Sequence, residues 1–270
     1  MTAVCLEMKQ VVKPWGRTDI GAFPNPIQDK VGEIWFDGPA GERPPLLVKY
    51  IFTSERLSIQ VHPDDAQACN KGLARGKEEI WYILDCKPGA TLGIGLTAAM
   101  APDHFRATAQ DGSLEQWIDW KPIKPGDCYF IPAGTVHAIG AGITLVEIQQ
   151  NADVTYRLYD YGRPRELHLD EGVAVSRLTP YKHVLIEAPL GSETRLIADS
   201  AAPFSLDLVH WNEDQSVSVP DGKLLWFTPL NGAGKVNGLS WEKGDCLLLE
   251  GECAFTLTAG PVSALLAIPC

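Results

Sequence analysis

The sequence predicts a mainly β protein, an antiparallel barrel or sandwich made of two barrel-like units with a few short helices inserted. Three observations support this. Short segments rich in β-branched and aromatic residues are separated by turns that contain glycine and proline. Strands and helices do not alternate as they do around a parallel sheet, and no glycine-rich phosphate loop is present. A stretch near residue 125 is echoed near residue 243.

The expected elements can be placed along the chain. Six segments have the composition and length of strands: Leu46–Phe52, Leu57–His62, Glu79–Leu84, Cys128–Ile131, Val136–Ile139 and Thr144–Gln149. A helix is expected over Pro63–Ala74, because the segment opens with Pro-Asp-Asp. A second is expected over Asp103–Trp117, where Phe105, Leu114 and Trp117 are at loosely helical spacing. The pattern favours an all-antiparallel fold over an α/β fold.

The echo predicts two related units. The segments PGDCYFIPAGTVHAI, 125–139, and KGDCLLLEGECAFTL, 243–257, align without gaps at an offset of 118 positions. Gly-Asp-Cys coincides in both, and Phe255 falls opposite His137. Gly-Asp turns before apolar strands are common, which is the alternative explanation. We expect a first unit at residues 1–178 and a second, degenerate unit at 179–270.

Composition and charge exclude several functions. The chain has 270 residues and a net charge of −11, which argues against a nucleic-acid partner, since that requires a basic face. A phosphorylated small molecule remains compatible, because a few local cations can hold one phosphate. No stretch reaches the roughly 18 apolar residues of a membrane span, and the N-terminus lacks a secretory pattern, so we expect a cytoplasmic protein without a membrane partner. Seven scattered cysteines without a CxxC pair predict no disulfide framework.

One segment resembles a known motif. Residues 125–140 contain two strand-like halves around a tight Pro-Ala-Gly corner. Gly126, Pro132, Gly134 and His137 match the second sequence motif of cupin β-barrels at every spacing. This resemblance implies that His137 is a metal ligand inside a small barrel. It also implies that both units are cupin-like jelly rolls, and that the second has lost its metal ligands.

Two further segments place polar residues on one face of a strand. In LSIQVH, Ser58, Gln60 and His62 alternate with apolar residues and share a face. In GKEEIWY, Lys77 and Glu79 share a face. Amide, imidazole and carboxylate groups can all bind a metal, so these faces are expected to point into the barrel beside the motif histidine.

The resulting candidate ligands are Gln60, His62, Glu79 and His137. The neighbouring Glu78 is the alternative carboxylate, and only strand phase favours Glu79. A set without thiolate suits Zn²⁺ in a catalytic site, and it is also similar to the two-histidine, one-carboxylate site of non-haem iron. One carboxylate against a dication leaves a net positive site, which favours an anionic or electron-rich ligand.

The combination of motifs resembles one enzyme family, the type I mannose-6-phosphate isomerases in their short bacterial form. The resemblance covers roughly residues 10–175. It includes the segments around Lys13–Gly16 and Gly32–Trp35, and it is carried mainly by Gln60–Asp65, Gly76–Tyr82, the 125–137 motif and Thr155–Tyr161.

The resemblance implies an enzyme of carbohydrate metabolism that interconverts mannose 6-phosphate and fructose 6-phosphate with one zinc ion per chain. It implies that the four candidate ligands hold the zinc. Arg157 corresponds to the family's active-site arginine, and Glu147 stands ten residues before it, where the family has a glutamate. Lys77 corresponds to an active-site lysine, and Ser58 to a serine near the sugar phosphate. The partner is then a small-molecule sugar phosphate, and the chain is expected to be a monomer or homodimer.

The residues leave the base of the reaction open. Lys77 is a candidate proton shuttle, and Glu147 either acts as the base or orients Arg157. Arg157 is suited to gripping phosphate or enediolate oxygens. Three rivals remain: an iron-dependent cupin oxygenase, a non-enzymatic sugar-binding cupin, and a cupin isomerase for another sugar phosphate or aldose. Gln60 as a fourth ligand and the Lys77–Arg157 pair speak against the oxygenase. A sugar-binding cupin would need no proton-shuttle groups, so the presence of Lys77, Glu147 and Arg157 speaks against it.

Overall fold

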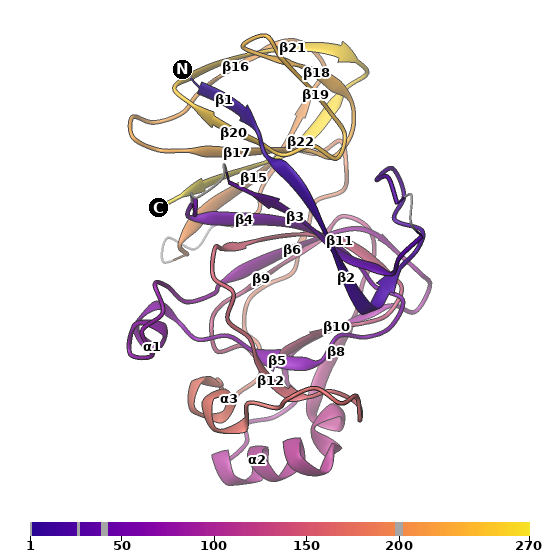
Figure 1. Ribbon diagram of the computed structural model, residues 1–270, viewed down its shortest axis with the longest axis vertical. Coiled ribbons are helices and arrows are strands. Elements are labelled where there is room, and N and C mark those ends of the chain that lie inside the picture. Colours follow the sequence, from indigo (N-terminus) through magenta and orange to yellow (C-terminus); the bar gives the residue numbers. More distant parts are fainter. Residues whose placement is uncertain (1, 26–27, 39–42, 198–201) are drawn as a thin grey trace.

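The computed structural model describes residues 2–25, 28–38, 43–197 and 202–270. Strands dominate it, which confirms the mainly β prediction, and the strand pairs in the described ranges are antiparallel. Figure 1 shows two units stacked along the long axis, with short helices at one end. Within the described part of the chain, no helix is long and apolar enough to cross a membrane.

Two sheets build the first unit, in the lower half of Figure 1. The seven-stranded sheet has the order β13 (Ile186–Glu187), β9 (Asp127–Ile131), β6 (Glu79–Cys86), β11 (Ile143–Gln150), β4 (Leu46–Phe52), β3 (Val31–Asp37) and β2 (Glu7–Arg17). The five-stranded sheet has the order β12 (Tyr156–Tyr159), β5 (Ile59–Val61), β10 (His137–Ile139), β7 (Thr91–Leu96) and β8 (Ile118–Pro122). All six predicted strands are therefore present, some with shorter or longer ends.

Two more sheets build the second unit. The six-stranded sheet has the order β1 (Thr2–Cys5), β20 (Leu247–Glu250), β17 (Leu225–Pro229), β22 (Val262–Pro269), β15 (Phe204–Trp211) and β14 (Thr194–Arg195). The four-stranded sheet has the order β16 (Gln215–Ser218), β21 (Glu252–Ala259), β18 (Ala233–Val236) and β19 (Leu239–Glu242). The unit thus consists of one large inner sheet and one smaller outer sheet, like the first.

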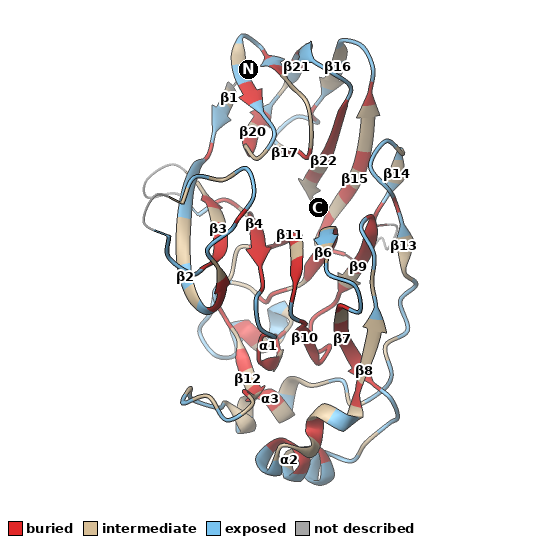
Figure 2. Ribbon diagram, turned by 90° about the vertical axis from the view of Figure 1, so that its right-hand side faces the viewer, coloured by how far each residue is buried: buried red, intermediate tan, exposed pale blue. Residues whose placement is uncertain are grey.

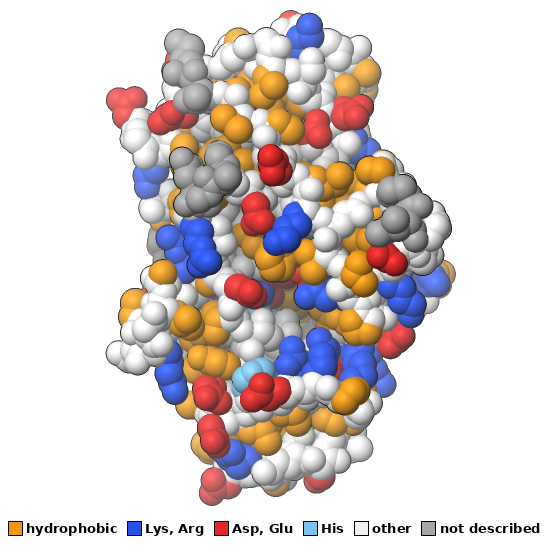
Figure 3. Space-filling model, viewed as in Figure 1, with side chains coloured by type: hydrophobic (Ala, Val, Ile, Leu, Met, Phe, Trp, Pro, Cys, Tyr) orange, Lys and Arg blue, Asp and Glu red, His pale blue; other side chains and the backbone are white. Residues whose placement is uncertain are grey.

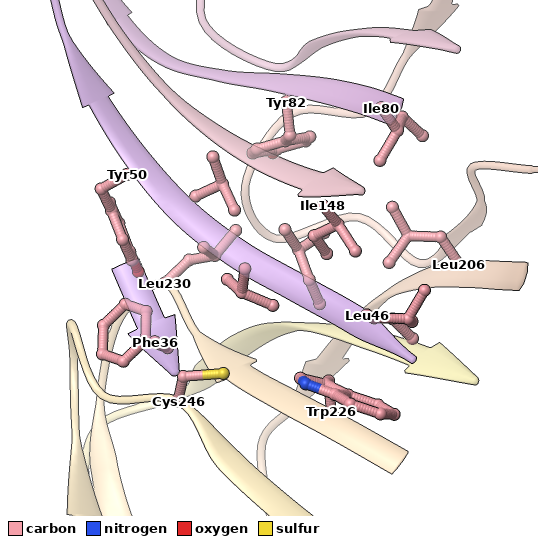
Figure 4. Packing of buried hydrophobic residues seen from close by; sticks show 14 of the residues in the cluster. Phe36, Leu46, Tyr50, Ile80, Tyr82, Ile148, Leu206, Trp226, Leu230 and Cys246 are labelled. Carbon is pink, nitrogen blue, oxygen red and sulfur yellow. The ribbon is translucent and has the colours of Figure 1, made fainter. Parts of the chain in front are cut away.

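The central strands of the seven-stranded sheet are buried on both faces. One face packs on the five-stranded sheet, and the other packs on the six-stranded sheet of the second unit, where Ile80, Ile148 and Leu46 face Leu206 and Trp226 (Figure 4). All seven residues of β4 are buried, as Figure 2 shows for the middle of the molecule. A sheet covered on both faces requires near-continuous apolar strands, which explains the sequence LLVKYIF.

The helices lie outside the sheets and differ from the predicted ones. The helix predicted over 63–74 is only α1 (Asp65–Cys69), because the Asp64 side chain caps its start and the chain leaves the helix before Gly72. The segment 103–117 divides into α2 (Pro102–Asp111) and the 3₁₀ helix η1 (Ser113–Trp117), since Gly112 between them has φ of +83°. A third helix, α3 (Leu169–Val175), was not predicted.

Two strands cross the division predicted from the sequence. β1, at the N-terminus, pairs with β20 of the second unit, and β13, after residue 178, pairs with β9 of the first. The division at 178/179 therefore stays a proposal about folding units. The hydrogen bonding shows that each unit borrows a short strand from the other's part of the chain, which covers an otherwise open sheet edge.

Candidate active site and metal centre

The turn before β10 determines where the His137 imidazole lies. Gly134 has φ of +80°, a conformation that suits glycine, and its N–H donates to the carbonyl of His62 at 2.8 Å. The Nδ1–H of His137 donates to the carbonyl of Thr135 at 2.8 Å, so its Nε2 carries the free lone pair. The Pro-Ala-Gly corner therefore brings two histidines together and fixes the tautomer of one.

Three of the four candidate ligands form one buried cluster. Ligand atoms of His62, Glu79 and His137 all lie within 4.8 Å of one another. The Glu79 carboxylate is 3.6 Å from Nε2 of His62 and 3.4 Å from Nε2 of His137. Gln60 lies beside them on β5, with its side-chain amide 3.3 Å from Nε2 of His137. The structure thus brings all four together.

The donor set fits a divalent cation. The Glu79 carboxylate is fully buried; Lys77 is the cation beside its Oε2, and its Oε1 has no hydrogen-bond donor in the described ranges. Burial lowers the pKa of His62 well below its usual range and that of His137 to about 4, so both imidazoles are neutral, as metal ligands must be. Burial and the nearby Glu147 carboxylate raise the pKa of Glu79 to about 7, as expected where further positive charge would complete the site.

Lys77 lies against the same cluster. Its Nζ is 2.9 Å from the Glu79 carboxylate and 3.1 Å from Nε2 of His62. This contact confirms that Lys77 and Glu79 share a face. Glu78 points elsewhere, and its carboxylate accepts from the N–H of Ala133 at 3.3 Å. Strand phase therefore selected the carboxylate that reaches the histidines.

A buried lysine that the sequence reasoning missed lies in the same interior. The ammonium of Lys49, on β4, donates to Glu147 at 3.0 Å and to Gln149 at 2.6 Å. Trp81 Nε1 donates to the other oxygen of Glu147 at 3.0 Å. Burial alone would raise the pKa of Glu147, but Lys49 and Lys77 lower it to about 2. A charged residue inside the apolar run LLVKYIF was the available signal.

Arg157, on β12, lies directly across the strand pair from Gln60. Its Nη1 donates to the carbonyl of Glu166 at 2.7 Å, and its buried Nε has no partner among the described residues. The suggestion that Glu147 orients Arg157 is not what the geometry shows, since the Glu147 oxygens accept from Lys49 and Trp81. The two residues lie on two different sheets, Glu147 on β11 and Arg157 on β12.

A cavity of about 200 Å³ lies beside the cluster. Its walls include Ser58, Gln60, Glu147 and apolar side chains of both sheets. Its cationic lining residues are Lys13, Lys49, Lys77, Arg157 and Arg165. Figure 3 shows that Lys and Arg side chains gather on one face of the molecule over the first unit. Such a wall suits an anionic ligand, although the whole chain is acidic.

Comparison with known proteins gives the family. No family model matches the sequence. The chain is 34% identical over 239 residues to mannose-6-phosphate isomerase ManA of Bacillus subtilis, covering 81% of this chain and 75% of that protein. It is 34% identical over 218 residues to the mannose-6-phosphate isomerase of Streptococcus mutans, covering 76% and 68% of the two chains.

The fold gives the same result. A crystal structure of the mannose 6-phosphate isomerase from Bacillus subtilis superposes with a TM-score of 0.81 and 27% identity, over 99% of both chains. The sequence relatives cover 76% and 81% of this chain, and the superposed structure covers 99% of it. The chain therefore belongs to the mannose-6-phosphate isomerase family.

Proposed function

We propose that this chain is a zinc-dependent aldose–ketose isomerase that interconverts mannose 6-phosphate and fructose 6-phosphate. The observation that carries the proposal is the buried His-Glu-His cluster next to a cavity walled by lysines and arginines. Relatives named for this reaction support it. A sugar phosphate is small, anionic and rich in oxygens, and it would meet cations at one end and a metal at the other.

The proposed zinc ligands are Gln60, His62, Glu79 and His137. Nitrogen and oxygen donors without thiolate suit zinc in a catalytic site. The described residues contain one such cluster, so we propose one zinc ion per chain. Bound there, the ion would supply Lewis-acid stabilisation of negative charge on the sugar oxygens.

The remaining task is proton transfer. Isomerisation moves a proton from C2 to C1 through an enediol(ate), while a second proton passes from O2 to O1. Glu147 is poorly suited as the base, because both its oxygens accept hydrogen bonds and its pKa of about 2 is far from neutral. We assign proton transfer to Lys77 and give Glu147 the role of holding Lys49 in place.

Arg157 and Ser58 are proposed to bind the substrate. Both line the cavity, and Arg157 offers a guanidinium with an unpartnered Nε. A planar fork of donors matches phosphate or enediolate oxygens, and a hydroxyl adds one more hydrogen bond. We extend the proposal to a cytoplasmic enzyme acting as a monomer or homodimer.

The test is isomerase activity with mannose 6-phosphate on protein stripped by a chelator and reloaded with zinc or with ferrous iron. We expect fructose 6-phosphate formation to disappear with the metal and to return with zinc. His62→Ala should remove both tight zinc binding and activity. His104→Ala is the matched control, because His104 is exposed on α2, and it should behave like the wild type.

Folded, zinc-loaded protein that fails to convert mannose 6-phosphate would contradict the substrate assignment. Full activity in His62→Ala, with its zinc content unchanged, would contradict the metal assignment. Circular dichroism and a metal assay on each variant separate these outcomes from a loss of folding.

A further inference from the structure

The cavity extends from the side of the metal cluster to two arginines, Arg157 and Arg165. Across the five-stranded sheet, His137, Gln60 and Arg157 are direct cross-strand partners on β10, β5 and β12. Direct partners point to the same face, with Cβ atoms about 4.5–5.5 Å apart. Arg157 therefore stands two strands away from His137 on the interior face, and Arg165 lines the same cavity.

A buried carboxylate holds Arg165. Asp160 follows β12 and is 2% exposed. It accepts from Nε and Nη2 of Arg165 at 2.5 and 2.7 Å, and from Nη2 of Arg163 at 2.7 Å. Two guanidinium groups thus share one carboxylate, and each is fixed by more than one hydrogen bond. The shared Asp160 carboxylate fixes the orientation of both guanidinium groups, because a guanidinium is planar and its donors form a rigid fork.

The two clamped arginines serve different surfaces. Arg163 donates to the carbonyl of Arg56 at 2.9 Å, approaches Glu55 at 3.8 Å and lines a separate outer cleft. Arg165 lines the catalytic cavity with Arg157. Arg163 and Arg165 therefore form a matched pair for mutagenesis: both contact the same carboxylate, but of the two only Arg165 lines the catalytic cavity.

The lysines of the cavity wall each have a carboxylate partner, whereas Arg165 shares its carboxylate with Arg163. Each lysine of the wall has a carboxylate within 3.3 Å: Glu33 for Lys13, Glu147 for Lys49 and Glu79 for Lys77. By contrast, the Arg157 guanidinium donates to a backbone carbonyl, and its buried Nε is unpartnered among the described residues. Asp160 and Glu166 act on Arg157 electrostatically, without a hydrogen bond between their side chains and its guanidinium in the described ranges.

The arginine end of the cavity consequently carries excess positive charge. Among the described residues, Arg165 pairs with one carboxylate, that of Asp160, which it shares with Arg163, and Asp153, a further acid lining the cavity, is exposed. After burial, the charge of Arg165 is the largest cause of a lowered pKa at Arg157, which shows that the two cations are close. Two neighbouring guanidiniums, one without a carboxylate in contact and one sharing its carboxylate with Arg163, suit an anionic ligand with several acceptor oxygens, such as a phosphate monoester.

We propose that Arg165, positioned by Asp160, is a second phosphate-binding residue, and that with Arg157 it makes the cavity selective for phosphorylated over unphosphorylated sugars. This inference rests on the proposed function, since it states which part of the cavity binds each end of the same sugar-phosphate substrate. The phosphate lies against the arginine pair, and the reacting C1–C2 end reaches the metal cluster. Asp160 does not touch the substrate and acts only by orienting Arg165.

The decisive comparison is Arg165→Ala against Arg163→Ala in the zinc-loaded full chain. Loss of charge-assisted hydrogen bonds to phosphate should raise KM for mannose 6-phosphate by about 10- to 100-fold in Arg165→Ala, with kcat within about threefold of the wild type. Arg163→Ala should stay within about threefold in both constants. The preference for mannose 6-phosphate over mannose should fall only in the Arg165 variant.

Binding of inorganic phosphate, followed by calorimetry, gives a readout that does not need turnover. Arg165→Ala should weaken it by about the same factor as KM, and Arg165→Lys should restore part of it, since lysine keeps the charge without the fork. Asp160→Asn should weaken it less than Arg165→Ala, and combining the two should add nothing further, because the clamp acts through the arginine.

Equal effects of Arg165→Ala and Arg163→Ala on phosphate binding would overturn the proposal, as would a fall in kcat with an unchanged KM. Should Arg165→Ala not fold, Arg165→Gln keeps a hydrogen bond to Asp160 and supports the same comparison. A wild type without isomerase activity would sink the proposed function, while the phosphate titrations would still decide whether Arg165 binds phosphate.

Discussion

The interiors of the two units share a framework and differ in chemistry. Between the sheets of the first unit lie His62, Glu79 and His137 with buried lysines and acids. Between the sheets of the second lie four aromatic rings in mutual contact, those of Trp211, Phe227, Trp241 and Phe255. One interior is organised by charge and hydrogen bonds, and the other by ring packing.

The framework they share is a turn followed by a change of sheet. The N–H of Lys124 donates to the Asp127 carboxylate at 3.0 Å, and the N–H of Glu242 donates to Asp245 at 2.8 Å. In each unit the strand after this turn, β9 or β20, belongs to the large sheet, and the following strand belongs to the smaller one. The duplication predicted from the sequence stays a prediction, and these matching turns support it.

The comparison teaches that a polar interior needs a complete set of partners. Lys49 and Glu147 tolerate burial because each satisfies the other, and Trp81 adds a further hydrogen bond. The second unit has no such charged network among its described residues, because aromatic side chains fill its interior, where only the indole N–H of a tryptophan such as Trp241 is left without a partner. The polar interior of the first unit thus carries the candidate active site, and the aromatic interior of the second unit contributes packing.

The largest expected effect comes from replacing His137 of the first unit by phenylalanine, the residue found at the corresponding position, Phe255, of the second unit. His137→Phe should lower isomerase activity by more than about 100-fold and reduce bound zinc below one per chain, because a ring without a lone pair replaces a ligand. Steady-state kinetics and a metal assay check this. A variant that keeps both activity and zinc would show that His137 is not a ligand.

The second prediction removes the ring in the second unit. Phe255→Ala should lower the free energy of unfolding by about 3–5 kcal/mol, since it leaves a cavity among three aromatic neighbours. Denaturant unfolding measures this. The activity of the remaining folded enzyme should match the wild type, and a specific loss of kcat would mean that the second interior takes part in catalysis.

The third prediction concerns acid stability. The pKa of Glu147 is lowered from 4.5 to about 2, so its ion pair with Lys49 stabilises the fold fully above about pH 4.5. This contribution, about 3 kcal/mol, should be lost as the pH falls toward 2. Glu147→Gln should already be destabilised at pH 7 and should show a flatter profile in this window, as followed by urea unfolding. Parallel profiles for the two proteins would contradict the assignment.

The smallest expected effects test the shared turn. Asp127→Ala and Asp245→Ala each remove one side-chain hydrogen bond to a backbone N–H, so each should cost about 1 kcal/mol of unfolding free energy. Thermal or denaturant unfolding of both variants measures this. Substantially different costs would indicate that the two turns are not equivalent. Ser192→Ala, which removes a side-chain hydrogen bond in an exposed turn, is a control.

Local patterns in the sequence located much of the site. Alternation placed Gln60 and His62 on one strand face, and the Pro-Ala-Gly corner delivered His137 beside them. Strand phase also chose Glu79 over Glu78. These features could be predicted because a strand's period of two and a glycine's φ are properties of a few consecutive residues.

The tertiary structure alone decided the rest. Lys49 becomes part of the site because the central sheet is covered on both faces, which depends on a second unit far along the chain. Arg165 reaches the cavity because Asp160 clamps it from a loop without regular structure. β1 pairs with β20 through hydrogen bonds between the two ends of the chain. Local sequence sets strand phase and turn geometry, whereas contacts between distant segments arise from packing that no single window of residues encodes.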